Sequence, residues 1–135
     1  MIRSYSELRS LPTLEERFYY LELHGTVGSP TFGTERWMNQ RFYTSRQWRQ
    51  VRDFVIVRDG GCDLGVPGYE VFKAPYIHHM NPMTAEHLID DDPDILDPEF
   101  LITVSMQTHN AIHFGDEKLL PQRYKERQPG DTKLW

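Results

Sequence analysis

Residues 77–82, IHHMNP, place two histidines side by side at the end of an apolar run and just before a proline. Successive side chains of a β-strand point to opposite faces, so His78 and His79 are predicted to meet different surroundings. Pro82 has no N–H to give to a sheet and helps to end the strand. Together with the residues before them, 68–76, they predict two short strands, the second of which carries the histidine doublet.

A second histidine pair follows about thirty residues later. The stretch LITVS, residues 101–105, is rich in β-branched residues and predicts a strand. The stretch MQTHNAIHF, residues 106–114, predicts a short helix that Gly115 ends. His109 and His113 are four residues apart, so a helix presents both on one face. The predicted order is strand, long connection, strand, helix.

The first part of the chain predicts short helices. Thr13 and Glu16 form a capping-box pattern at the start of a helix expected to end near Gly25. After a connector rich in glycine and proline, Thr34 is the expected N-cap of a second short helix, ERWMNQRFY, at residues 35–43.

Ser45 is the expected N-cap of a third helix. In it, Trp48, Val51 and Val55 recur at helical spacing and predict a packed face, and Gly60–Gly61 provide a stop. By contrast, residues 83–100 are too acidic and too often interrupted by proline for a long regular element.

Length and composition indicate one modest α+β domain. The chain has 135 residues, 39% of them hydrophobic. We expect residues 1–60 to form a helical N-terminal part, residues 62–115 a strand–strand–helix module, and residues 116–135 an irregular tail. No run of eighteen apolar residues and no apolar leader is present, and Cys62 is the single cysteine. These features predict a soluble protein, with no membrane partner, in a reducing cytoplasm.

Charge is segregated along the chain, although the net charge is −5. Residues 74–117 contain nine acidic side chains and no lysine or arginine, whereas residues 36–58 have one acidic side chain and six arginines, at 36, 41, 46, 49, 52 and 58. The arginine-rich segment can form a surface that follows phosphates, or simply the solvated face of a helix. Both interpretations remain open.

The histidines predict a metal centre. Two imidazoles on one helix face can bind one metal ion, and a third ligand from a neighbouring strand leaves positions open for water and substrate. Only one histidine of the 78–79 doublet can easily face that ion, and the other is free to act as a base near neutral pH. His24 and His87 are interpreted as ordinary surface or hydrogen-bonded histidines.

Two other chemistries fit less well. Zinc peptidases carry a glutamate directly after the first helical histidine, and Asn110 at that position cannot act as a base. Nucleophilic catalysis by Cys62 needs a nearby base that the surrounding GGCDLG does not offer, so a buried, inert thiol is expected. Hydrolysis of a phosphodiester needs one metal ion and one general base, which the four histidines can supply.

The doublet, the following strand and the helical His-x-x-x-His resemble the HNH endonucleases, whose fold is called ββα-metal, and especially the DNase domains of colicins. The upstream stretch FYTSRQWRQVRDFVIVRDGGCDLG, residues 42–65, is similar to the segment that precedes this module in phage and bacterial HNH proteins. The resemblance implies that His79 is the general base. It implies that His78, His109 and His113 bind one divalent ion, which could be Zn, Mg, Mn or Ni. DNA is the implied partner, gripped through its phosphates by Arg41, Arg46, Arg49 and Arg52.

Two positions depart from the family pattern. Many HNH proteins hold a structural zinc on two Cys-x-x-Cys pairs, but here Gly65, Ser105 and Thr108 replace three of the cysteines, and no such zinc is expected. The asparagine that braces the long loop of the family is replaced by Phe100. We expect the bracing to come from elsewhere, from Asp97 or from Asn81.

The whole chain also resembles small proteins encoded by phages and prophages of Gram-positive bacteria. The expected function is therefore a DNA endonuclease in the cytoplasm of the bacterial host. By analogy with phage HNH proteins, the packaging terminase is a candidate partner. The alternative is a non-catalytic phage binding or assembly protein that keeps a metal-stabilised HNH fold.

Overall fold

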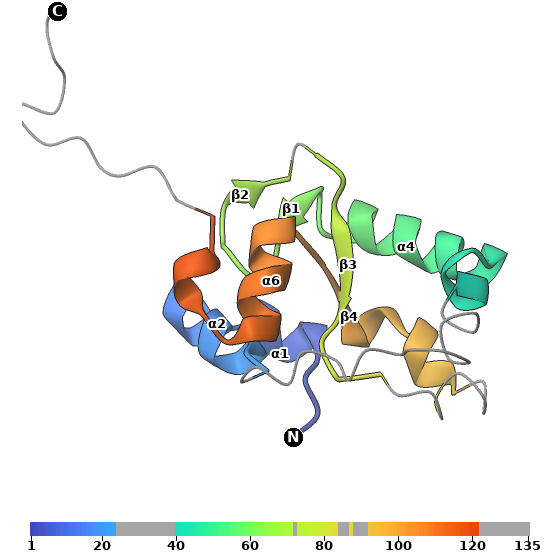
Figure 1. Ribbon diagram of the computed structural model, residues 1–135, viewed down its shortest axis with the longest axis horizontal. Coiled ribbons are helices and arrows are strands. Elements are labelled where there is room, and N and C mark those ends of the chain that lie inside the picture. Colours follow the sequence, from blue (N-terminus) through green and yellow to red (C-terminus); the bar gives the residue numbers. More distant parts are fainter. Residues whose placement is uncertain (24–39, 72, 84–86, 88–91, 122–135) are drawn as a thin grey trace, which may run out of the picture.

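A computed structural model describes residues 1–23, 40–71, 73–83, 87 and 92–121 (Figure 1). Within this part the elements occur in the order α1 Tyr5–Arg9, α2 Leu14–Leu21, α4 Arg46–Arg58, β1 Cys62–Asp63, β2 Tyr69–Glu70, β3 Tyr76–His79, the 3-10 turns η1 Pro93–Leu96 and η2 Pro98–Phe100, β4 Leu101–Val104, α6 Met106–Phe114, and η3 Glu117–Leu119. The strands form two separate antiparallel pairs, β1–β2 and β3–β4. The predicted α+β class is confirmed.

The pair β3–β4 lies between two helices, with α6 on one side and α4 on the other (Figure 1). In the register of this pair Ile77 faces Thr103, His78 faces Ile102 and His79 faces Leu101. All four residues of β4 are buried because helices cover both faces of the pair. The strands predicted around 77–82 and 101–105, and the helix that follows them, are therefore confirmed.

Alternation along the two strands divides the core in two. One cluster lies on the α6 side and joins the N-terminal helices to the sheet; its buried residues are Leu8, Leu21, Leu23, Met80, Ile102, Val104 and Ile112. The other lies on the α4 side and contains Trp48, Val55 and Leu101, with Ile77 and Val51 packed against it. The packed face predicted for the third helix is thus confirmed.

Side-chain caps start the principal helices where the sequence predicts them. Thr13 accepts a hydrogen bond from the Glu16 amide, and Ser45 accepts one from the Trp48 amide. Gly115 ends α6 in the left-handed conformation, at φ 67°. The end of α2 was wrongly predicted, because the helix stops at Leu21 and not near Gly25. Glu22 is extended there, and the next amide, that of Leu23, donates to Ile112 O on α6.

The sequence did not predict α1 or β1. The helix α1 has five residues and buries Leu8 alone, so it has no apolar period to detect. The strand β1 has two residues, too few for an alternating pattern. After α4, Gly60 and Gly61 adopt φ values of 64° and 69°, the left-handed turn that the predicted stop requires.

Parts of three other predictions lie outside the described residues. Residues 40–43 at the end of the predicted second helix are helical, but Thr34 and the residues up to 39 are not described. Most of the acidic loop from 84 to 91 and the tail from residue 122 are also outside. Among the described elements, no helix has the length and apolar character needed to cross a lipid bilayer.

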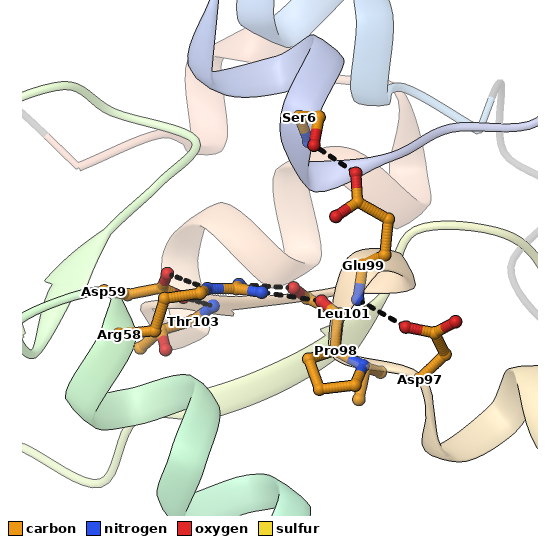
Figure 2. A network of polar contacts seen from close by, with 8 residues as sticks. All are labelled: Ser6, Arg58, Asp59, Asp97, Pro98, Glu99, Leu101 and Thr103. Atoms are coloured by element: carbon orange, nitrogen blue, oxygen red, sulfur yellow. Dashed lines mark hydrogen bonds and ion pairs between the residues drawn. The ribbon is translucent and has the colours of Figure 1, made fainter.

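Arg58 and Asp59, at the end of α4, brace the chain before β4 (Figure 2). Arg58 donates to the carbonyls of Pro98 and Leu101 at 2.6 and 2.7 Å and to the Asp59 carboxylate at 2.8 Å. Asp59 in turn accepts the amide of Thr103 at 2.8 Å. Arg58 was expected on the basic surface segment, but its guanidinium points inward and fixes the loop that enters β4.

Neither residue proposed for this bracing does it alone. Asp97 accepts the amide of Glu99 and caps the η2 turn, as Figure 2 shows. Asn81 pairs with the backbone of Arg3, with one hydrogen bond in each direction, at 2.8 and 2.9 Å. Asn81 therefore fastens the N-terminal segment to the end of β3. The loop before β4 is held by hydrogen bonds of both Asp97 and Arg58 with its backbone.

The buried carboxylate of Asp63 ties β1 to the start of α6. It accepts hydrogen bonds from the Gly65 amide, the Ser105 amide and hydroxyl, and the Thr108 hydroxyl. Burial raises the pKa of Asp63, and these hydrogen bonds oppose that rise. Gly65 also packs closely against Thr108. A Cβ atom built on Gly65 would lie 2.6 Å from a methyl carbon of Thr108, so a larger residue would not fit without a shift. Gly65, Ser105 and Thr108 thus meet around one carboxylate.

Candidate metal centre

Three of the four predicted histidines come together between β3 and α6. His78 projects from β3 towards α6, where His109 and His113 lie one turn apart. One ring nitrogen from each of the three lies within 4.8 Å of the others. The helix brings its two histidines together by spacing, and strand alternation selects His78 and not His79 as the third.

The rings are arranged around a common point. The His109 and His113 ring centres are 4.3 Å apart, with their Nε2 atoms 3.0 Å from each other. His78 meets both rings edge-on, at centroid distances of 5.5 and 5.1 Å. Two imidazole nitrogens bound to one tetrahedral zinc ion are about 3.3 Å apart, given Zn–N bonds of about 2.0–2.1 Å. Small side-chain shifts therefore suffice to place three nitrogens around one ion.

The chemistry of the donor atoms also fits a metal ion. His78 is 2% exposed, and its Nε2 atom has no hydrogen-bond partner within the described part of the chain. A buried polar atom without a partner is costly, and coordination is one way to satisfy it. Burial lowers the pKa of all three imidazoles, that of His109 to about 4. They are therefore neutral at pH 7, which is the state that binds metal.

The lowered pKa values predict that acid destabilises the metal-free protein. In the unfolded chain a histidine has a pKa near 6.5, whereas in the folded protein the pKa of His109 is about 4. Between these two pH values the unfolded state binds more protons than the folded state, so stability falls as the pH falls. We expect the free energy of unfolding to fall by about 1 kcal/mol from His109 alone between pH 7 and pH 5, allowing for its partial exposure. Urea denaturation with a chelator present measures it. A His109→Gln variant with the same pH dependence as the wild type would contradict the prediction.

His79 lies apart from the other three, on the α4 side of β3. Its ring stacks on Trp48 at 5.3 Å and 14°, with Phe42 and Tyr43 at 6.2 and 6.5 Å. Its Nε2 atom lies 3.0 Å from the carbonyl oxygen of Ile95. Since a carbonyl only accepts, Nε2 carries the hydrogen, and Nδ1 keeps its lone pair in the neutral ring. The two histidines of the doublet therefore face opposite sides of the strand, as alternation predicts, and only His78 joins the cluster.

A cavity of about 220 Å³ gives access to the same ring. His79 lines it together with Asn81, Asp92, Ile95 and Phe100. None of the three clustered histidines is among its lining residues in the described part of the chain. Burial lowers the pKa of His79, and the hydrogen bond to Ile95 works in the opposite direction. The ring is thus a neutral acceptor at pH 7 beside a space that water can enter.

Of the predicted DNA-binding arginines, Arg41 lies just before α4, Arg46 and Arg49 lie in its first turn, and Arg52 lies in its middle. Arg41, Arg46 and Arg49 are exposed, and Arg49 donates to the carbonyl of Thr44 at 2.8 Å. Arg52 is partly exposed and pairs with Asp53 at 3.6 Å. In the sequence these arginines flank Phe42, Tyr43 and Trp48, the aromatic residues that pack on His79.

Tyr76 and Trp48 are site residues that the sequence did not assign. Tyr76 stacks on His109, and Trp48 stacks on His79. Tyr76 could have been predicted to lie near the histidine cluster, because it is two residues before His78 and so lies on the same face of the strand. Trp48 was expected only to pack in the core, since helical spacing reveals which face is buried and not what it packs against.

Comparisons of this chain with protein-family models, with curated protein sequences and with solved structures found no significant match.

Proposed function

We propose that this chain is a metal-dependent endonuclease of the HNH type that hydrolyses phosphodiester bonds of DNA. The observation that carries the proposal is the approach of His78, His109 and His113 to within 4.8 Å, on a strand–strand–helix unit. A fourth histidine, next in sequence to His78, has the tautomer that a general base needs. The proposed cell compartment is the cytoplasm of a bacterial host.

In this proposal His78, His109 and His113 hold one divalent ion and leave its other positions open. When bound, such an ion stabilises negative charge on the scissile phosphate and on the leaving oxygen. A set made only of imidazoles favours zinc or nickel over magnesium, which prefers oxygen ligands.

His79 would take the proton of the attacking water at Nδ1. The Ile95 carbonyl holds the other nitrogen, so the ring cannot turn without losing that hydrogen bond. Stacking on Trp48 restrains the ring further. His79 is close enough to His78 for a charge on one ring to disfavour a charge on the other. The three histidines that would hold the ion lie on the α6 side of β3, and His79, which would hold the proton, lies on the α4 side.

Arg41, Arg46, Arg49 and Arg52 are the side chains proposed to bind phosphates. Replacing Arg46 with alanine should weaken DNA binding equally for unrelated sequences, because phosphates carry no sequence information. The slope of log K against log salt should become shallower by about 0.9 for each phosphate that the protein no longer neutralises. Fluorescence anisotropy with two unrelated duplexes over a salt series measures both effects. A weakening confined to one sequence would contradict the prediction.

The direct test is cleavage of supercoiled plasmid by the metal-free protein after addition of Mg²⁺, Mn²⁺, Ni²⁺ or Zn²⁺ in turn. We expect at least one ion to restore cleavage and a chelator to stop it. A His109→Ala variant should neither bind metal nor cut, which excludes a contaminating nuclease. Absence of cleavage with all four ions would refute the nuclease.

One observation favours a second function. His79 is outside the cluster and is packed against aromatic side chains, as a structural histidine would be. A non-catalytic binding or assembly protein would use three histidines and one ion for stability alone. It predicts that the ion raises the melting temperature while DNA stays intact.

A further inference from the structure

The ring of Tyr76 covers one side of the histidine cluster. Tyr76 begins β3 and lies on the same strand face as His78. Its ring is nearly parallel to that of His109, with centroids 5.2 Å apart and an interplanar angle of 17°. Tyr76 is 42% exposed, so it forms the outer wall of the cluster and is not a core residue.

The three imidazoles differ in what holds them. His78 is 2% exposed and lies edge-on to both other rings, so its neighbours fix it. His109 is partly exposed, and the terminal torsion of a histidine ring is broad and soft. A flat ring stacked on His109 limits that torsion to orientations in which the His109 Nε2 atom stays near that of His113.

We propose that Tyr76 is a positioning residue of the metal centre, which holds the imidazole of His109 in its ligating orientation by stacking. This inference rests on the proposed metal site and does not require that the protein cleaves DNA. Groups that orient metal-bound histidines are usually hydrogen-bond acceptors, and their loss typically costs about 10–100-fold in metal affinity. The side chain of Asn110 hydrogen-bonds to His109 in this way. The face of the Tyr76 ring adds a second restraint by stacking, so the phenol hydroxyl should be dispensable.

The test measures Co²⁺ affinity of the full chain by competition with a chromophoric chelator and records the visible Co²⁺ absorption. Tyr76→Ala should weaken Co²⁺ binding about tenfold or more and alter the absorption bands. Tyr76→Phe should stay within about twofold of the wild type, because it keeps the stacked face. Tyr19→Ala, which removes an 81% exposed tyrosine on α2, is the matched control and should change nothing.

Circular dichroism of the metal-free variants checks that each is folded. Wild-type affinity in Tyr76→Ala overturns the inference, as does an equal loss in Tyr76→Phe and Tyr76→Ala. If the wild type binds no Co²⁺, the metal site and this inference fail together. If Co²⁺ binding depends on Tyr76 as expected but no ion supports cleavage, only the nuclease fails.

Discussion

If the proposed nuclease function is correct, replacing His79 with alanine is expected to lower the rate of DNA cleavage by about 10²–10⁴-fold, the usual contribution of a general base. The bound ion should remain, because His79 is outside the cluster formed by His78, His109 and His113. The proton of the attacking water would have no acceptor on the protein, since the lone pair of Nδ1 is removed with the ring.

Some stability should be lost as well, because alanine leaves Trp48 without its stacking partner and the Ile95 carbonyl without its donor. A His79→Gln variant separates the two effects. Its amide can still donate to the carbonyl of Ile95, but it cannot accept a proton near neutral pH. Cleavage under single-turnover conditions, metal content and melting temperature should be measured for both variants. Wild-type cleavage by His79→Gln would show that His79 is not the base, while loss of metal would place it among the ligands.

Local patterns were sufficient to predict the elements that form the candidate centre. Ser45 caps α4 and Gly115 closes α6, as the sequence predicted. Ser105 was expected to end the strand, and it caps α6 instead. Alternation in a strand predicts that His78 and His79 lie on opposite faces, and this prediction needs no knowledge of what packs on either face. Periodicity within short segments therefore paired His109 with His113 and predicted that one histidine of the doublet would join them, and the resemblance to HNH proteins chose His78, which the cluster contains.

The remaining features depend on contacts between distant residues. Arg58 resembles the arginines at 46 and 49 in sequence, but it reaches carbonyls forty residues away and more, at Pro98 and Leu101. Which helix face a strand meets is also a tertiary property, so the sequence could not predict that His79 would stack on Trp48. Loop bracing was assigned to one residue by analogy with a side chain that Phe100 replaces, whereas several residues share it in this fold.

Replacing Arg58 with methionine is expected to reduce the free energy of unfolding by about 3–5 kcal/mol, the usual cost of breaking a buried ion pair from one side. Methionine fills similar volume, but it leaves the Asp59 carboxylate, 0% exposed, without its cation. The carbonyls of Pro98 and Leu101 lose their donors, and Tyr5 loses the guanidinium that lies 3.7 Å from its ring centre. Since β4 follows this loop directly, the start of β4 should become less firmly held.

Arg52→Met is the matched control for Arg58→Met. Arg52 lies in the same helix, and its pair with Asp53 is 40% and 74% exposed at 3.6 Å, so its removal should cost less than about 1 kcal/mol. Urea denaturation of both variants, followed by tryptophan fluorescence, gives the difference. If Arg58→Met is too unstable to purify, Arg58→Lys, which keeps a charge but cannot reach two carbonyls and a carboxylate together, should show an intermediate loss. Equal stabilities of the Arg52 and Arg58 variants would mean that the inward guanidinium does not hold the loop, and that β4 is kept in place by its buried side chains alone.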